Sequence, residues 1–541
     1  MQKVLTAEQM REVDRLTTEK YGIPSLLLME NAAHAVARVL TEKLGGTVQG
    51  KSILVLCGKG NNGGDGLATA RVLWDRGADV NVCMMFADDE FHGDAAKNLD
   101  LIRNLHAGQI PFQDPTICMT ELGAHRSFFD NWDSYFRPDV VVDALFGTGL
   151  TRPLNSEHTQ LAAQYASMIQ SKERPILLSI DLPSGLNADK GDTIGGCFRA
   201  DVTVTFTSPK PASVLAPAFR FSGELRIESI GSPSELIELQ DSKLYLADEN
   251  DARKWLGQTQ FSDASYKNKR GHVLMIAGSR DYTGAAVLCG NSAIRSGVGL
   301  VTLAVPESSR ESVVARVTPE VMVRGIAETS DGSAAVAAFD EIDAFLKNVH
   351  VIAIGSGLSS KEAETREFIR RIVQERKTPV LIDADGLTAL SPFAIDGSAE
   401  LPLILTPHEG EFMRLLGTDD KSVIKDRVAA VRDFAVKHNV ILVLKGERAL
   451  IGEPGGKVVV NPTGNSGLGK AGNGDTLTGL IAGFAGQAVQ MKIDMFETVV
   501  AAVYVAGMAG DIAEKKYGKR VMTASDVRDC LTKVFDSLVP R

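Results

Sequence analysis

Short apolar runs rich in Val, Ile and Leu recur along the first half of the chain, between segments whose apolar positions follow a helical spacing. The runs occupy residues 52–56, 80–86, 140–143 and 176–181. Continuous apolar runs of this length are typical of strands buried on both faces, and their alternation with helical segments indicates a parallel sheet. The first half is therefore predicted to be a Rossmann-like domain with three α/β/α layers.

This pattern lapses between residues 229 and 250, where Gly231-Ser-Pro-Ser234 is followed by a polar stretch. Such punctuation is typical of a domain junction. A second series of apolar runs then follows, at residues 272–277, 351–355, 380–383, 403–406 and 441–445. The 541 residues also exceed what one hydrophobic core usually supports. We therefore predict two different α/β domains, residues 1–235 and 240–541.

The N-terminus offers no sign of a targeting segment. Thr6-Ala-Glu-Gln9 is a possible capping box that opens an amphipathic helix, unlike the apolar core of a signal peptide. The longest apolar stretch, residues 498–513, is interrupted by Gly507, Gly510 and Asp511 and looks too short to span a bilayer. We expect a cytoplasmic protein without a membrane partner.

Charge and cysteine usage narrow the function classes further. The formal net charge of -10 argues against a nucleic-acid partner. The six cysteines lack the paired spacing of a zinc site or a disulfide framework, which favours a reducing compartment. They are Cys57, Cys83, Cys118, Cys197, Cys289 and Cys530.

A glycine-rich segment follows the first apolar run and precedes a helical segment at residues 67–76. Gly58, Gly60 and Gly63 satisfy the G-x-G-x-x-G spacing of a dinucleotide fingerprint, so an ordinary dehydrogenase is one alternative. However, Asp65 would compete with a pyrophosphate for the positive end of the helix. A plain strand-to-helix turn capped by Asp65 is a further alternative.

Acidic residues stand at the ends of two neighbouring predicted strands. Asp143 ends one strand and Asp181 ends the next. Ligands of open parallel sheets bind outside the carboxyl edge, where these two side chains would lie with Asn62 of the glycine-rich segment. Together they could form an oxygen-rich site for a hard cation or an acid/base site for a small ligand.

Three motifs give the first half a family resemblance: Gly22-Ile-Pro-Ser-Leu-Leu-Leu-Met-Glu-Asn-Ala-Ala33, the Gly-Asn-Asn-Gly-Gly-Asp-Gly66 segment, and Asp181-Leu-Pro-Ser-Gly185. Over about residues 1–230 the chain resembles the NAD(P)H-hydrate epimerase family. The resemblance implies that Asp181 is catalytic and contacts the reacting ring, and that Asn62, Asp143 and Ser184 hold a potassium ion.

The same resemblance implies two substrate-binding loops: Asn61, Asn62, Gly63, Gly64 and Asp65, then Gly147, Thr148, Gly149, Leu150, Thr151, Arg152 and Pro153. Relatives that serve mainly as binding partners share the fold, so a binding module is the alternative for this half.

Two glycine-rich passages lie close together in the second half. Gly464 to Lys470 spells G-x-x-x-x-G-K, but Ala471 stands where a P-loop needs Ser or Thr, so we reject that motif. Gly472-Asn-Gly-Asp475 directly precedes a helical stretch at residues 476–485. Glycine amides there can hold a transferring phosphoryl group while Asp475 accepts a hydroxyl proton. A plain helix cap is the alternative.

A set of motifs in fixed order gives the second half its resemblance: Gly271-His-Val-Leu274, Gly355-Ser-Gly-Leu358, Asp383-Ala-Asp-Gly-Leu387, Thr406-Pro-His-Glu-Gly-Glu-Phe412, Lys445-Gly446 and the segment ending at Asp475. Over about residues 245–535 the chain resembles the ribokinase-like, ADP- or ATP-dependent NAD(P)H-hydrate dehydratase family. Asn473 departs from the Thr or Ser of commoner members but leaves the backbone donors and Asp475 in place.

This resemblance implies a three-layer α/β/α fold with Asp475 as the catalytic residue. It places the hydrated nicotinamide near Ala285, Gly357, His408 and Asp475. The nucleotide would bind along Lys445, Gly446, Glu447, Arg448 and Ala449 and against Gly474. Taken alone, His408 could equally be a buried structural histidine.

Together the resemblances imply a bifunctional enzyme that repairs damaged nicotinamide nucleotides. The first domain would interconvert the R and S forms of hydrated NADH and NADPH with K⁺. The second would dehydrate the S form with Mg²⁺ and ADP or ATP; likeness to bacterial and archaeal fused members favours ADP, giving AMP and phosphate. A small-molecule kinase with an N-terminal binding module is the alternative. We expect small-molecule substrates and a homo-oligomer.

Overall fold

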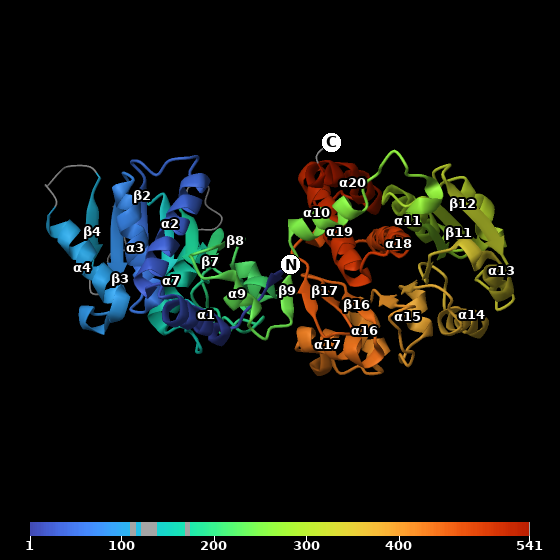
Figure 1. The fold of residues 1–541 in the computed structure, drawn as a ribbon, viewed down its shortest axis with the longest axis horizontal. Helices are drawn as coiled ribbons and strands as arrows, with labels where there is room; N and C mark the ends of the chain where they lie inside the picture. Colours follow the sequence, from blue (N-terminus) through green and yellow to red (C-terminus); the bar gives the residue numbers. More distant parts are fainter. Residues whose placement is uncertain (109–114, 121–137, 168–173, 540–541) are drawn as a thin grey trace. The chain divides into compact units, whose positions relative to one another are not determined.

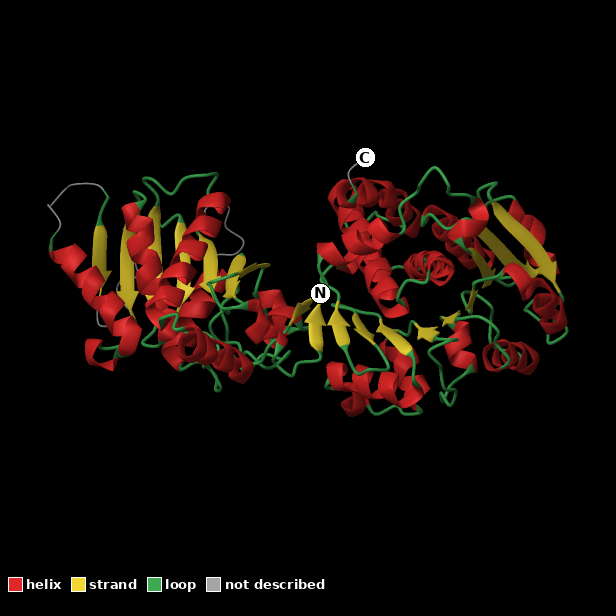
Figure 2. Cartoon of the chain, viewed as in Figure 1, coloured by secondary structure: helices red, strands yellow, loops and turns green. Residues whose placement is uncertain are grey.

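The computed structural model describes residues 1–108, 115–120, 138–167 and 174–539. The chain divides into two compact units, residues 2–242 and residues 243–541 with Met1. The division falls inside the predicted junction segment 229–250. Each unit has a sheet with helices on both sides (Figures 1 and 2).

The sheet of the first unit is parallel throughout its described pairings, as predicted. Its strand order is β4-β3-β2-β5-β6-β7-β8. The strands are β2 (Ser52–Cys57), β3 (Asp79–Met84), β4 (Ile117–Thr120), β5 (Val140–Ala144), β6 (Ile176–Ile180), β7 (Val202–Phe206) and β8 (Glu224–Glu228). The apolar runs of the sequence therefore mark strands of one sheet.

Strand β2 shows why these runs are apolar at every position. Ile53 and Val55 belong to one core, with α2 (Ser25–Lys43) and α3 (Asn61–Asp75). Leu54 and Leu56 belong to another, with α7 (Ser156–Ser167). Since side chains alternate across a strand, a helical layer on each face requires apolar residues throughout. The three-layer prediction is confirmed.

Helix α3 begins at Asn61 and not at residue 67, so the predicted loop residues Asn61 to Asp65 are helical. A Cβ added to Gly63 would lie 1.6 Å from the Gly58 carbonyl oxygen, and one added to Gly66 would lie 2.5 Å from Ala144 Cβ. The glycines therefore let the helix pack closely on the strand ends, and this packing outweighs their low helix propensity.

The first helix of this unit lies next to the loops that follow β6 and β7. Helix α1 (Ala7–Tyr21) begins with the predicted capping box, in which Gln9 N donates to Thr6 Oγ1 and Thr6 N donates to Gln9 Oε1. Ala7 N donates to Asp189 Oδ1 at 2.7 Å. The remaining helices are α4 (Gly93–Ala107), α8 (Pro211–Val214) and α9 (Ser234–Glu238).

The sheet of the second unit follows the order β9-β18-β17-β16-β15-β14-β13-β10-β11-β12. Its strands are β9 (Leu244–Leu246), β10 (His272–Ile276), β11 (Leu300–Pro306), β12 (Val321–Ile326), β13 (Val351–Ile354), β14 (Val380–Ile382), β15 (Leu403–Leu405), β16 (Ile441–Leu444), β17 (Leu450–Gly452) and β18 (Val458–Val460). The described pairings of this sheet are parallel except those of β17, which pairs antiparallel with both β16 and β18. Strands β17 and β18, of three residues each, are too short to give a distinct apolar pattern in the sequence.

Helices cover both faces of this sheet as well (Figure 1). One layer contains α10 (Glu249–Gln258), α11 (Thr283–Arg295), α18 (Asn473–Met491), α19 (Met495–Tyr517) and α20 (Ala524–Leu538). The other includes α14 (Ala363–Gln374), α16 (Glu409–Leu416) and α17 (Arg427–His438). In the first layer, Trp255 stacks on Phe484 with ring centroids 3.8 Å apart, and its Nε1 donates to Thr498 Oγ1 at 2.9 Å. The predicted three layers are confirmed.

Helix α19 corrects the expectation that the apolar stretch at residues 498–513 is too short to span a bilayer. The helix is long and apolar enough, by length and composition, to cross a membrane, because it extends beyond residues 498–513 at both ends. However, 67% of its most apolar window is buried inside the structure. Its apolar surface is thus largely covered by its own unit, including α18 and α20.

All six cysteines lie among the described residues, and all are free. Within the same residues there is also no group of three or more His, Cys, Asp or Glu side chains that could hold a metal ion.

Candidate active sites

Two of the predicted cation ligands are joined directly at the carboxyl edge of the first sheet. Asp143 Oδ1 accepts from Ser184 Oγ at 2.6 Å, and Asp143 Oδ2 accepts from Ser184 N at 2.8 Å and from Ser179 Oγ at 2.9 Å. Burial raises the pKa of Asp143, and the hydrogen bonds from Ser184 and Ser179 oppose that rise. The carboxylate is thus held in one orientation by its neighbours.

Asn62 faces the same region from the start of α3. Both its amide oxygen and its amide nitrogen are buried without a hydrogen-bond partner among the described residues. A Cβ on Gly147 would lie 3.1 Å from Asn62 Oδ1 and 3.2 Å from Asp181 Oδ2, so these three residues converge. The unpartnered amide oxygen of Asn62, together with the Asp143 carboxylate and the Ser184 hydroxyl at the same sheet edge, fits the donor set of a hard cation such as K⁺.

The two predicted substrate loops differ in accessibility. Gly63 and Gly64 are buried against neighbouring backbone and side chains, whereas Asn61 is exposed. Leu150 is also buried, and its carbonyl accepts from Asn187 Nδ2, so its side chain packs inside the unit. The accessible part of the second loop consists of Gly147, Thr148, Gly149, Thr151, Arg152 and Pro153.

Asp181 occupies a strained position after β6, with a φ of 64°. Its Oδ1 accepts from Lys210 Nζ at 2.6 Å and from Thr205 Oγ1 at 3.0 Å. The sequence reading missed Lys210 and Thr205. The signal was available, because Lys210 follows β7, the strand next to β6, at the same sheet edge as Asp181.

Two further carboxyl groups face this centre. Burial raises the pKa of Asp65 well above its usual range, and the carboxyls of Asp181 and Asp14 raise it further. Asp65 lies inside α3, whose N-cap is Gly60, so the reading of Asp65 as a cap is wrong. Burial, opposed by Lys210, raises the pKa of Asp14 to about 6. Asp14 was missed because it stands in a helix otherwise read only as amphipathic.

In the second unit, Asp475 is the third residue of α18. The N-cap is Gly472, with a φ of 90° and, in the described structure, no side-chain hydrogen bond, so the plain-cap reading of Asp475 is wrong. Burial raises the pKa of Asp475 to about 6, and the Asp383 carboxylate adds to the rise. A carboxylate of that pKa suits a general base near neutral pH.

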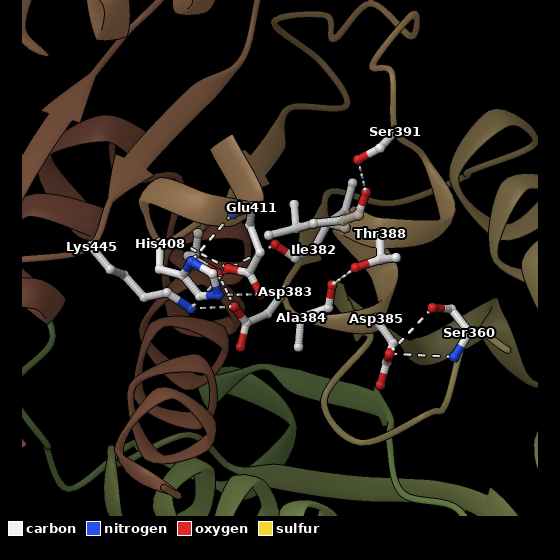
Figure 3. Close-up of polar contacts among 12 residues, drawn as sticks. Ser360, Ile382, Asp383, Ala384, Asp385, Thr388, Ser391, His408, Glu411 and Lys445 are labelled. Carbon is white, nitrogen blue, oxygen red and sulfur yellow. Dashed lines mark hydrogen bonds and ion pairs between the residues drawn. The ribbon is translucent and has the colours of Figure 1, made fainter. Parts of the chain in front are cut away.

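Asp383 is the centre of a polar network that the sequence reading did not assign (Figure 3). Its Oδ1 accepts from Lys445 Nζ at 2.7 Å and from Thr406 Oγ1 at 2.8 Å, and its Oδ2 accepts from Thr478 Oγ1 at 2.9 Å. Burial lowers the pKa of Lys445, but Asp383 and Glu411 more than offset that effect and the pKa is raised. Asp383 is the first residue of the Asp383-Ala-Asp-Gly-Leu387 motif, so the sequence did contain a signal for this site residue.

The glycines of this unit bring other predicted residues together. A Cβ on Gly474 would lie 3.8 Å from Lys445 Nζ and 4.0 Å from Asp383 Oδ2. A Cβ on Gly357 would lie 2.7 Å from the Cβ of Ala285. The structure therefore places the predicted nucleotide residues Gly474 and Lys445 side by side, and likewise the predicted substrate residues Gly357 and Ala285.

His408 is the N-cap of α16, and its Nδ1 accepts from Glu411 N at 3.2 Å. The side chain is 57% exposed, so the alternative of a buried structural histidine is wrong. Glu411 Oε2 also lies 3.8 Å from Lys445 Nζ. Glu411 therefore contacts both His408 and Lys445, which Figure 3 shows gathered beside Asp383, and so links the predicted substrate and nucleotide residues.

A second cationic side chain, Arg427, contacts the predicted nucleotide-binding segment. The Glu447 carbonyl accepts from Arg427 Nη1 at 3.1 Å, and Arg427 Nη2 is buried without a hydrogen-bond partner in the part of the chain described. Gly446 and Arg448 both have positive φ, and burial lowers the pKa of Arg448 to about 10. By contrast, Lys470 of the rejected P-loop donates to the carbonyls of Arg520 and Met522.

Comparison with known proteins also divides the chain into two parts. Residues 273–533 match a family model described as NAD(P)H-hydrate dehydratase, and residues 25–212 match the YjeF-related protein N-terminus. A crystal structure of ADP/ATP-dependent NAD(P)H-hydrate dehydratase from Bacillus subtilis, co-crystallized with ATP/Mg²⁺, is 30% identical. It covers 55% of this chain and 99% of its own, with a TM-score of 0.47.

Two relatives match along nearly the whole chain. The bifunctional NAD(P)H-hydrate repair enzyme Nnr of Moorella thermoacetica is 37% identical over 536 residues, covering 99% of this chain and 97% of the relative. The Nnr enzyme of Thermofilum pendens is 34% identical over 538 residues, with the same coverage. The chain belongs to the family of bifunctional NAD(P)H-hydrate repair enzymes.

Proposed function

We propose that the second unit dehydrates the S form of hydrated NADH and NADPH, using ADP and releasing AMP and phosphate. The observation that carries this proposal is Asp475 at the open start of α18, with its pKa raised to about 6 and Lys445 alongside. Asp475 accepts the proton of the C6 hydroxyl as the phosphoryl group arrives, and the amides near Gly474 bind the phosphoryl oxygens.

Phosphorylation converts the poor hydroxide leaving group at C6 into phosphate. The ring nitrogen electrons expel the phosphate, and loss of a proton from C5 restores the dihydropyridine. Lys445 and Arg427 would supply positive charge along the nucleotide segment, and bound Mg²⁺ would supply further charge that neutralises the phosphates. His408, Ala285 and Gly357 border the side on which the nicotinamide would bind.

In the first unit, the proposed reaction interconverts the two C6 epimers. As the carboxylate paired with Lys210, Asp181 accepts the proton of the C6 hydroxyl at Oδ2 while the C6–N1 bond breaks, which leaves an aldehyde at C6, and the proton passes to N1. Rotation about the C5–C6 bond presents the other face of the aldehyde; N1 then re-forms the C6–N1 bond, and its proton returns to the C6 oxygen by way of Oδ2. Asn62, Asp143 and Ser184 would hold K⁺, which would supply a fixed positive charge beside the substrate loop.

Product analysis tests both proposals on the full chain. Hydrated NADH supplied as an epimer mixture with ADP and Mg²⁺ should regain the absorbance of NADH and release one AMP and one phosphate per repaired molecule. A stable phosphorylated product would instead identify the alternative, a small-molecule kinase. The same experiment with ATP identifies the preferred nucleotide.

Omission of the nucleotide isolates the first unit. A purified R form should then convert to an R/S mixture faster than in buffer, and Asp181→Asn should abolish the acceleration. If the chain binds the R form without accelerating its conversion, the first unit is a binding module.

A further inference from the structure

Lys210 is almost completely enclosed in the first unit, with a side chain only 2% exposed. Its ammonium group donates to Asp181 Oδ1 at 2.6 Å, to Thr205 Oγ1 at 2.9 Å and to the Phe206 carbonyl oxygen at 3.1 Å. A lysine ammonium has three donors. All three are therefore used inside the protein, and Lys210 has none left for a substrate.

The consequence for Asp181 is an unequal use of its two oxygens. Oδ1 accepts from both Lys210 and Thr205. Oδ2 is the oxygen that points toward the accessible loop, since it lies 3.2 Å from the Cβ position of Gly147. One oxygen is thus fixed by the protein, and the other is presented to the loop at which the substrate is proposed to bind.

The groups that fix Asp181 stand on rigid elements. Thr205 lies on β7 and is fully buried, and Asp181 N donates to the Val204 carbonyl oxygen of the same strand at 2.7 Å. The strained backbone of Asp181 is held by this pairing. Such support is what a reacting group needs if it must be held within about half an ångström of its working position.

We propose that Lys210, with Thr205, is a positioning residue for the epimerase reaction, which locks Oδ1 of Asp181 so that Oδ2 alone meets the C6 hydroxyl. This inference rests on the proposed function of the first unit. The other charged groups that face Asp181 are Asp14 from α1 and Asp65 from α3. A buried ion pair is often replaceable by apolar side chains without loss of stability, so stability alone is a weak reason for Lys210.

The test compares Lys210→Met, Thr205→Val and Lys210→Arg in the full chain, with Lys190→Met as the matched control. Lys190 is an exposed lysine in the loop after Asp181. Epimerisation of the R form is followed without nucleotide. Lys210→Met should lower kcat by roughly 10²-fold, as for a misplaced acid/base group, with KM changed less than about threefold. Thr205→Val should lower kcat by about tenfold, and Lys210→Arg should recover part of the loss.

Dehydration of the S form with ADP should be unchanged in every variant, which shows that the second unit is intact, and denaturant unfolding measures the folded fraction of the first unit. The inference is overturned if Lys210→Met keeps its kcat, or if Thr205→Val and Lys210→Met lose activity only in proportion to the fraction of unfolded first unit. Asp181→Asn separates the two levels of the argument. If this variant still epimerises, the proposed role of Asp181 fails; if it is inactive while Lys210→Met is normal, only the positioning role fails.

Discussion

Each unit contains a buried aspartate paired with a lysine at the carboxyl edge of its sheet, and the two pairs have nearly the same length. Lys210 Nζ lies 2.6 Å from Asp181, and Lys445 Nζ lies 2.7 Å from Asp383. Their surroundings differ. Lys210 is 2% exposed, whereas Lys445 is 21% exposed and stands beside Gly474. The first lysine is enclosed, and the second is accessible.

This difference indicates opposite roles for the same ion pair. In the reaction proposed for the first unit, the lysine restrains the aspartate and the aspartate reacts. In the second unit Asp383 is itself held by Thr406 and Thr478, so the aspartate would restrain the lysine, which would keep donors for an incoming phosphate. The carboxylate proposed to react in the second unit is a separate residue, Asp475.

The largest effect on activity is expected when Asp475 is replaced. Asp475→Asn should lower dehydratase kcat by roughly 10²-fold or more, the usual loss for a general base, while epimerisation continues. In the unchanged protein, kcat/KM should fall as the pH drops through about 6, since the protonated Asp475 carboxyl is no longer basic enough to take the hydroxyl proton. Near-normal dehydration by the variant would remove Asp475 from the mechanism.

The comparison predicts a different kinetic signature for Lys445. Lys445→Met should raise the KM for the nucleotide by about 10- to 100-fold, which corresponds to about 1.4 to 2.8 kcal/mol of charge-assisted hydrogen bonding. Steady-state kinetics with varied ADP measures this, with the exposed Lys361→Met as a control. An unchanged KM with a reduced kcat would make Lys445 a positioning residue like Lys210.

The cation site predicts a smaller effect, confined to the first unit. Replacing K⁺ in the buffer by tetramethylammonium should slow epimerisation by about tenfold, the order expected when one well-placed charge contact is lost. Dehydration of the S form serves as the internal reference. Equal epimerisation rates in both buffers would show that Asn62, Asp143 and Ser184 do not hold a functional ion.

The smallest effect concerns the stability of the first unit. The pKa of Asp14 rises from an ordinary value of 3.8 to about 6 on folding, so folding takes up a proton. Its contribution to stability is complete below pH 3.8 and is lost as the pH rises through about 6. Asp14→Asn should therefore stabilise the unit at pH 7.5 by about 1 to 3 kcal/mol and flatten this pH dependence. Denaturant unfolding at several pH values checks this, and a destabilised variant would contradict it.

The features that could be predicted from the sequence share one physical cause, the burial of parallel strands on both faces. Strands buried on both faces leave apolar runs, and the acids at their ends, Asp143 and Asp181, are marked by position alone. Lys210 and Asp383 also follow strands, but their ion-pair partners, Asp181 and Lys445, follow other strands, and only the fold brings each pair into contact. Helix α3 was misplaced because tertiary packing of its glycines outweighs their local preference. Asp14 belongs to no motif, and its raised pKa depends on the groups against which α1 packs.

The stacked indole of Trp255 has a practical consequence for spectroscopy. Because Trp255 is 2% exposed and lies against Phe484, its fluorescence should be emitted at short wavelength while the second unit is folded. Trp74 of the first unit is half-buried and should emit at longer wavelength. Loss of the blue component during denaturation would therefore report the melting of the second unit from within the intact chain, without any attached label.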